Sequence, residues 1–199
     1  MPRLVAGVIA IAAWVGLATR VTVAYNGDLV STVWAVGRYF TMLTGLLVAM
    51  VMTAIALGRK QSPVLLAGTT LASILVGVVY VTLLRHDTSG GRYVSNLLLH
   101  YIVPPGMGVY WLLFGPKSGL RWRDAFIWLL YPLAYFVYAL GRGEVDGRYP
   151  YPFMDLNKIS LPAAIYNGLA IGTLFVLAGL GLVALSRTLS RERESQPLG

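Results

Sequence analysis

Six long runs of apolar residues alternate with short polar stretches along this chain. The runs cover approximately residues 4–24, 34–57, 63–84, 95–114, 122–140 and 163–185, and a charged tail follows at 187–199. A helix needs about 20 apolar residues to cross the hydrocarbon core of a bilayer. The pattern therefore predicts an all-α polytopic membrane protein with six transmembrane helices in one bundle.

The polar stretches between the runs predict the orientation in the membrane. Arg59 and Lys60 follow the second run, and Ser62 with Pro63 is typical of an N-cap followed by a first-turn proline. Basic residues in short loops favour the cytoplasmic side. With six spans both termini share one side, which holds nine of the 16 Lys and Arg residues, including those of the short basic loops. We therefore expect both termini in the cytoplasm.

The composition supports a membrane protein and disfavours several other classes. Hydrophobic residues make up 57% of the chain and charged residues only 12%, whereas a soluble domain has about 25% charged residues. The net charge of +8 comes from basic residues scattered at the ends of apolar runs, so we expect no nucleic-acid partner. Cysteine is absent, which excludes disulfides and thiol nucleophiles. His86 and His100 are the two histidines, so we expect no metal site and no cofactor, and the length predicts a single domain.

The fourth run differs from the others because it contains polar side chains and two consecutive prolines. Asn96 and His100 lie one helical turn apart, and Pro104 and Pro105 follow. An ionisable residue within a membrane segment marks a functional site by default. Pro104 removes the N–H that would bond to the His100 carbonyl, so we expect a kink or break that borders a cavity.

Thr41 of the second run is predicted to lie at the same depth as His100. Counted from the predicted helix ends at about 1.5 Å per residue, both side chains lie roughly 8–10 Å inside the outer boundary. A neutral imidazole can accept the proton of a threonine hydroxyl as the hydroxyl attacks a substrate. Asn96, Arg38 and Tyr39 are nearby donors that could orient the base or stabilise an oxyanion.

Each of these residues also has a structural interpretation. A threonine in a membrane helix usually bonds its own backbone, and a buried histidine can simply join two helices. An asparagine can act as a cap, and a proline pair can do no more than bend a helix. His86, beside Asp87 in a polar loop, is expected to be solvated. Gly168 and Gly172 form a GxxxG pattern that favours close helix packing over a ligand site.

Aromatic residues and prolines alternate in the stretch before the sixth run. Tyr149, Tyr151 and Phe153 are separated there by single prolines. Such a stretch is stiff and amphipathic, which suits an interfacial lid over the helix bundle. The same composition suits an interfacial anchor, and the two interpretations stay open.

Three stretches, taken in order, resemble one known family. They are Arg38-Tyr39-Phe40-Thr41, then Asn96-x-x-x-His100 with Pro105, and then Tyr149-Pro150-Tyr151-Pro152-Phe153. Together they resemble the androgen-induced-protein-like integral membrane family, including its six-helix bacterial branch, over approximately residues 34–185. Animal members of that family are threonine hydrolases that cleave fatty acid esters of hydroxy fatty acids. The resemblance implies that Thr41 is the catalytic threonine, that His100 is the catalytic histidine, and that Asn96 supports them.

The chain departs from the family pattern at two places. Bacterial relatives often have Phe-Thr-x-x-Ser-Asn, where this chain has Thr44 in place of the serine and Gly45 in place of the asparagine. Animal members have a second histidine where this chain has Leu97. These differences bear on the substrate more than on the pair formed by Thr41 and His100.

The expected function is therefore that of an intramembrane threonine hydrolase acting on lipid carboxylic esters. The expected location is the bacterial cytoplasmic (inner) membrane, with the site toward the outer leaflet and lipid esters and membrane lipids as partners. The alternative is a non-catalytic membrane protein that binds a lipid or small molecule in the same polar pocket. A transporter is disfavoured because the chain has no internal repeat and no intramembrane carboxylate for coupling.

Overall fold

The computed structural model describes residues 1–84 and 91–195, and no strand occurs among these residues. Five helices are long and apolar enough to cross a membrane, or six if one bent pair counts as a single span. The predicted all-α polytopic class is thus confirmed. Where the length predicts one domain, the chain divides into two compact units, Met1–Pro116 and Lys117–Gly199.

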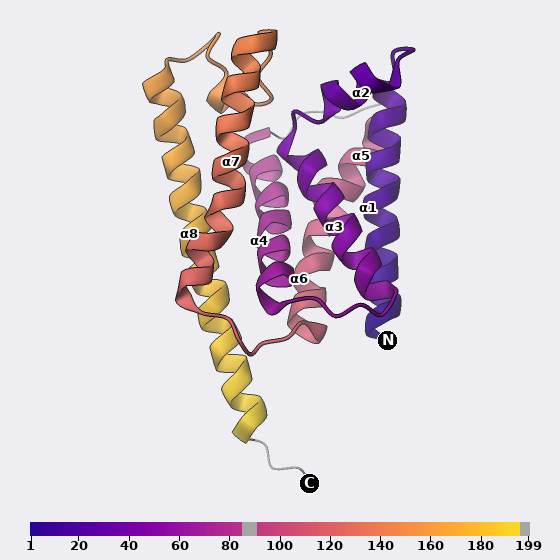
Figure 1. Ribbon diagram of the computed structural model, residues 1–199, viewed down its shortest axis with the longest axis vertical. Helices are drawn as coiled ribbons and strands as arrows, with labels where there is room; N and C mark the ends of the chain where they lie inside the picture. The colour runs from indigo at the N-terminus through magenta and orange to yellow at the C-terminus, as the bar shows by residue number, and fades with distance from the viewer. Residues whose placement is uncertain (85–90, 196–199) are drawn as a thin grey trace. The chain divides into compact units, whose positions relative to one another are not determined.

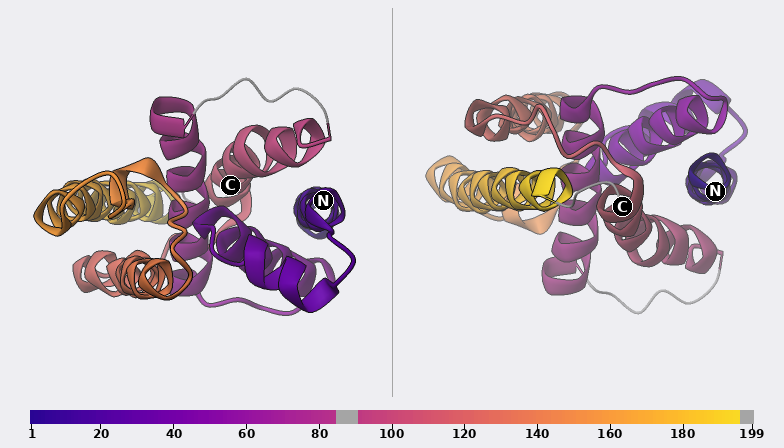
Figure 2. Two further views of the ribbon diagram at one scale, coloured as in Figure 1. Left: turned by 90° about the horizontal axis from the view of Figure 1, so that it is seen from above. Right: turned by 90° about the horizontal axis from the view of Figure 1, so that it is seen from below.

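The first unit contains four helical spans arranged in a ring (Figures 1 and 2). They are α1 (Pro2–Ala24), α3 (Phe40–Ala56), α4 (Pro63–Val79) with its continuation η1 (Tyr80–Leu84), and a composite span of α5 (Tyr93–Asn96), η2 (Leu97–Ile102) and α6 (Val103–Phe114). α1 packs against α3 and α6, and α4 packs against the same two helices. The four spans therefore pack in a ring, and the segment η2 of the composite span also contacts α3.

The second predicted span is not one helix. α2 (Leu29–Val36) and α3 meet at an angle of 101°, so the prediction of a single helix over 34–57 is wrong in its first part. Gly37 is a poor residue for a helix interior, at a cost of about 1 kcal/mol relative to alanine. Arg38 Nε donates to the Ala35 carbonyl at 3.0 Å, which satisfies an acceptor at the end of α2. Tyr39 is extended (φ −90°, ψ 131°) and is the N-cap of α3.

The proline pair changes the winding of the fourth predicted span without breaking it. Tyr93–Phe114 is one span of 22 residues, and its segment η2 is a π-helix. Pro104 and Pro105 lack the N–H groups that would bond to the carbonyls four residues earlier. A π-helical turn pairs each N–H with the carbonyl five residues back, so it accommodates such an interruption within a continuous helix.

The second unit is a pair of long helices packed along each other. They are α7 (Trp122–Asp146) and α8 (Leu161–Ser195), and the loop between them contains the 3₁₀ turn η3 (Pro152–Met154). A Cβ atom on Gly168 would lie 2.9 Å from the ring of Phe136. The expectation that the GxxxG pattern serves close helix packing is thus confirmed at Gly168, whereas a Cβ atom on Gly172 would make an ordinary contact 3.5 Å from Leu129.

Both helices of the second unit extend beyond their predicted ends at residues 140 and 185. α7 continues to Asp146, where Gly147 ends it with a left-handed conformation at φ 69°. α8 continues to Ser195, through most of the predicted charged tail. The hydropathy pattern locates the apolar part of a helix, and it does not detect charged turns that extend the same helix.

Candidate functional site

Thr41 and His100 meet inside the first unit. Oγ1 of Thr41 lies 3.3 Å from Nε2 of His100, although the two residues are 59 positions apart in sequence. Thr41 is the second residue of α3, and His100 belongs to η2, which packs against α3. Thr44, one turn further along α3, is fully buried. The sequence predicted a matched depth for Thr41 and His100 without showing that their helices are neighbours; the structure brings the two side chains together, while their catalytic roles remain predictions.

The second ring nitrogen of His100 identifies the tautomer. Nδ1 lies 3.2 Å from the main-chain carbonyl oxygen of Asn96. A carbonyl oxygen only accepts, so this hydrogen bond requires the proton on Nδ1 and leaves a lone pair on Nε2. Nε2 then accepts from the Thr41 hydroxyl, as a general base must. Asn96 therefore contacts His100 through its main chain, whereas the sequence suggested its side chain.

Tyr80, which the sequence did not single out, stacks on His100. The two ring centroids are 3.8 Å apart and the ring planes differ by 22°. A second ring, that of Tyr101, lies nearly perpendicular to the ring of Tyr80, with centroids 5.8 Å apart and planes at 85°. Tyr80 opens η1 and is buried. A tyrosine near the end of an apolar run usually indicates an interfacial anchor, so only the packing of α4 against η2 reveals this contact.

Three glycines allow the neighbouring helices to approach the segment that carries His100. A Cβ atom on Gly16 of α1 would lie 2.8 Å from Leu99, and one on Gly45 of α3 would lie 3.3 Å from it. On α4, a Cβ atom at Gly77 would lie 3.1 Å from the main-chain oxygen of His100. Helices α1, α3 and α4 thus hold η2 from three directions, and the crowding at Gly45 accounts for the absence of a longer side chain there.

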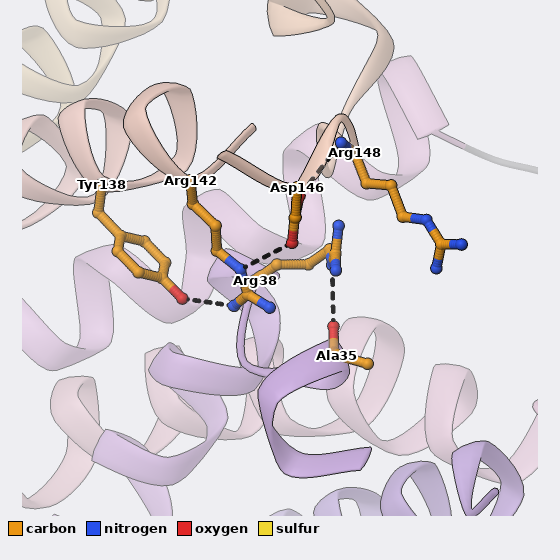
Figure 3. Close-up of polar contacts among 6 residues, drawn as sticks. All are labelled: Ala35, Arg38, Tyr138, Arg142, Asp146 and Arg148. Carbon is orange, nitrogen blue, oxygen red and sulfur yellow. Dashed lines mark hydrogen bonds and ion pairs between the residues drawn. The ribbon is translucent and has the colours of Figure 1, made fainter. Parts of the chain in front are cut away.

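Arg38 and Tyr39 lie in the bend that leads into Thr41. Arg38 is buried, and its Nε donates to the carbonyl of Ala35, a contact that Figure 3 shows. The guanidinium of Arg20 lies over the ring of Tyr39, 5.6 Å from its centroid. The two predicted supporting residues therefore fix the backbone before the candidate nucleophile, and a role as oxyanion donors remains a prediction.

The aromatic residues predicted to form a lid belong to the second unit. The Tyr149 hydroxyl donates to the Glu144 carboxylate at 2.6 Å, and this bond raises the pKa of Tyr149 to about 12 because it favours the protonated phenol. The rings of Tyr151 and Phe153 stack with centroids 5.2 Å apart. These contacts give the loop a defined conformation. Its position as a lid over the site of the first unit remains a prediction.

A polar network secures the end of α7 (Figure 3). Buried Arg142 donates through Nη1 to the Tyr138 hydroxyl at 2.6 Å and through Nε to Asp146 at 3.4 Å. The main-chain N–H of Arg148 donates to the other carboxylate oxygen of Asp146 at 3.1 Å. The carboxylate thus joins the last turn of α7 to the loop that carries the aromatic residues.

Among the side chains of residues 1–84 and 91–190, no cluster of three or more His, Cys, Asp or Glu could hold a metal ion. His86, predicted to be solvated, lies outside the described residues. Comparison of the chain with protein-family models, curated proteins and solved structures finds no match.

Proposed function

We propose that this protein is an intramembrane hydrolase that cleaves lipid carboxylic esters, with Thr41 as nucleophile and His100 as general base. The contact of 3.3 Å between Thr41 Oγ1 and His100 Nε2 carries the proposal. The carbonyl of Asn96 accepts from the opposite ring nitrogen. A chain of hydrogen bonds thus joins a hydroxyl, a base and a group that orients the base. This series is the arrangement that activates a hydroxyl nucleophile.

The reaction proceeds in two steps, and both use the same histidine. Thr41 Oγ1 attacks the acyl carbon while His100 Nε2 accepts the hydroxyl proton, and the protonated imidazole then gives this proton to the departing alcohol. Water next attacks the acyl-threonine ester, with its proton passing to Nε2. The carboxylic acid leaves as the proton returns to Thr41 Oγ1. No metal or organic cofactor takes part.

The position of Thr41 in the first turn of α3 favours this chemistry. Met42 and Leu43 donate their N–H groups to the Tyr39 carbonyl, so the start of α3 is well formed. The aligned peptide dipoles place about half a positive elementary charge at the N-terminus of a helix. Negative charge that develops on the substrate oxygen beside Thr41 is therefore stabilised, and most strongly in the transition state.

The substrate class follows from the surroundings of the pair and from the sequence resemblance. Helices α1, α4 and the composite span are long and apolar enough to lie in a bilayer. An ester with long acyl chains could therefore reach the pair sideways between helices. The similarity of three sequence stretches to hydrolases of fatty acid esters of hydroxy fatty acids points to the same type of ester. We place the protein in the bacterial cytoplasmic membrane, with the site toward the outer leaflet.

A fluorophosphonate probe tests the proposed nucleophile and base. The attacking hydroxyl displaces fluoride from phosphorus and remains covalently labelled, and mass spectrometry of the peptide identifies the modified residue. We expect label on Thr41 in purified wild-type protein. His100→Ala should slow labelling about 100- to 10,000-fold, the usual contribution of a general base, and Thr41→Val should abolish it.

A matched variant controls for the loss of any buried hydroxyl. Thr70 is a buried threonine of α4 whose hydroxyl donates to the Leu66 carbonyl at 2.8 Å. Thr70→Val should retain wild-type labelling. Absence of label in a folded wild-type protein, or label on Thr41 that does not depend on His100, would contradict the hydrolase mechanism. In that case a lipid that co-purifies with both wild type and Thr41→Val would support the non-catalytic lipid-binding function.

A further inference from the structure

We infer that Tyr80 is a positioning residue of this hydrolase: its ring holds the His100 imidazole so that Nε2 faces Thr41, and it stabilises the imidazole when it becomes protonated. The inference rests on the proposed function. It begins from the stacking of the two rings, with centroids 3.8 Å apart and planes at 22°.

The imidazole of His100 can turn about its Cβ–Cγ bond, and the stacked ring of Tyr80 restrains this motion together with the two hydrogen bonds. The bonds of Nδ1 to Asn96 and of Nε2 to Thr41 lie at the two ends of the imidazole. Rotation about the Cβ–Cγ bond moves Nε2 away from Thr41 and Nδ1 away from Asn96. A ring stacked on one face opposes that rotation, because turning the imidazole would bring its edge into the face of Tyr80.

Tyr80 is itself held in place by the structure around it. It is buried at the start of the π-helical segment η1, and the ring of Tyr101 packs against it edge to face. One turn earlier, Gly77 allows α4 to approach the main chain of His100. The close approach of α4 and η2 therefore brings the two rings into contact and limits the movement of both.

The stack also acts on the charge that His100 acquires during the reaction. When Nε2 takes the proton from Thr41, the imidazole becomes a cation against the face of a tyrosine ring. Such a contact is favourable because the ring face carries negative electrostatic potential. It is made more strongly in the transition state than in the ground state, so its loss should lower kcat and leave KM nearly unchanged.

The test compares Tyr80→Phe and Tyr80→Leu in the purified, full-length protein with a chromogenic fatty acyl ester as substrate. Tyr80→Phe keeps the aromatic face and should retain kcat within about twofold. Tyr80→Leu removes the face and should lower kcat about tenfold with little change in KM, as expected for loss of one cation–π contact. If the leucine variant does not fold, Tyr80→Met supplies a flexible apolar side chain at the same position.

Tyr110→Leu is the matched control. Tyr110 is a buried tyrosine of α6 in the same unit, and it packs against Phe114 with ring centroids 5.4 Å apart. The Tyr110→Leu substitution should lower the free energy of unfolding, as Tyr80→Leu does, and should leave kcat unchanged. An equal fall in kcat for Tyr110→Leu, or an unaffected kcat for Tyr80→Leu in an active protein, would overturn the inference alone. A wild-type protein that neither turns over the ester nor labels on Thr41 would overturn the proposed function and this inference with it.

Discussion

Replacement of Gly77 by alanine tests whether close helix contact holds the His100 segment in place. An added Cβ atom would lie 3.0 Å from Cβ of Pro104 and 3.1 Å from the main-chain oxygen of His100. Favourable separations between such atoms are about 3.5–4.0 Å. A proline ring and a main-chain carbonyl have no side-chain rotation by which to withdraw. The methyl group can therefore be accommodated only if α4 and η2 move apart.

The expected cost follows from two opposing effects. Overpacking of a close contact destabilises a protein by about 1–3 kcal/mol, whereas alanine in a helix is favoured over glycine by about 0.5–1 kcal/mol. Gly108→Ala gains the helix preference of alanine without the overpacking, because its Cβ would lie 3.6 Å from Cδ1 of Ile74, an ordinary contact. The difference between the two variants thus isolates the packing cost. For a chain of this size, a packing cost of about 1–3 kcal/mol corresponds to a fall of about 2–12 °C in Tm.

The assay is thermal unfolding of both variants and wild type in the same detergent, followed by circular dichroism. We expect Gly108→Ala to melt at or slightly above the wild-type Tm and Gly77→Ala to melt clearly below Gly108→Ala. Ester turnover by Gly77→Ala should also fall, because moving the His100 main chain disturbs the contact with Thr41. Equal Tm values for the two alanine variants would refute the packing argument.

Two further predictions concern contacts away from the candidate site. Trp14 Nε1 donates to Thr53 Oγ1 at 3.1 Å between α1 and α3. A double-mutant cycle with Trp14→Phe and Thr53→Val should therefore give a coupling of about 0.6 kcal/mol in the free energy of unfolding. Strictly additive effects of the two substitutions would show that this hydrogen bond does not contribute. Tyr149 has its pKa raised to about 12 by its bond to Glu144, so this bond stabilises the fold at and below about pH 10 and is lost as the pH rises through about 12. The titration of Tyr149 is followed as tyrosinate absorbance, by subtracting the signal of a Tyr149→Phe variant in the same background. In the Glu144→Gln background, this difference signal should appear at lower pH than in wild type. An unchanged titration would contradict Glu144 as the cause of the raised pKa.

Much of the fold could be predicted from the sequence because apolar runs and helix caps are local signals. Ser62 accepts a hydrogen bond from the Leu65 N–H at 3.0 Å, and Pro63 begins α4, as the sequence indicated. The bend between α2 and α3 could not be predicted in the same way. Apolar residues continue on both sides of it, and hydropathy measures how apolar a segment is without giving its direction. The structure places Thr41 at the start of a helix, where the sequence suggested a helix interior.

The candidate site could be predicted only where its chemistry resides in unusual side chains. His100 stood out as an ionisable side chain in an apolar run, whereas Thr41 was singled out mainly by the resemblance of its sequence stretch to a hydrolase family. The hydrogen bond between Asn96 and His100 could not be predicted, because Asn96 accepts it through its main-chain carbonyl and every residue has one. Tyr80 could not be predicted because its role depends on the packing of α4 against η2, which sequence spacing does not specify.

The two π-helical segments connect the fold to the proposed chemistry. Pro104 removes the usual donor to the carbonyl of His100, which accounts for the changed winding of η2. The freed carbonyl lies against Gly77, where an added Cβ atom would lie only 3.1 Å from it. That approach brings η1, the other π-helical segment, beside η2, and the first residue of η1 is the tyrosine that stacks on His100. Two residues therefore account together for the environment in which His100 meets Thr41. Pro104 interrupts the backbone hydrogen bonds around η2, and Gly77 allows α4 to pack closely against it.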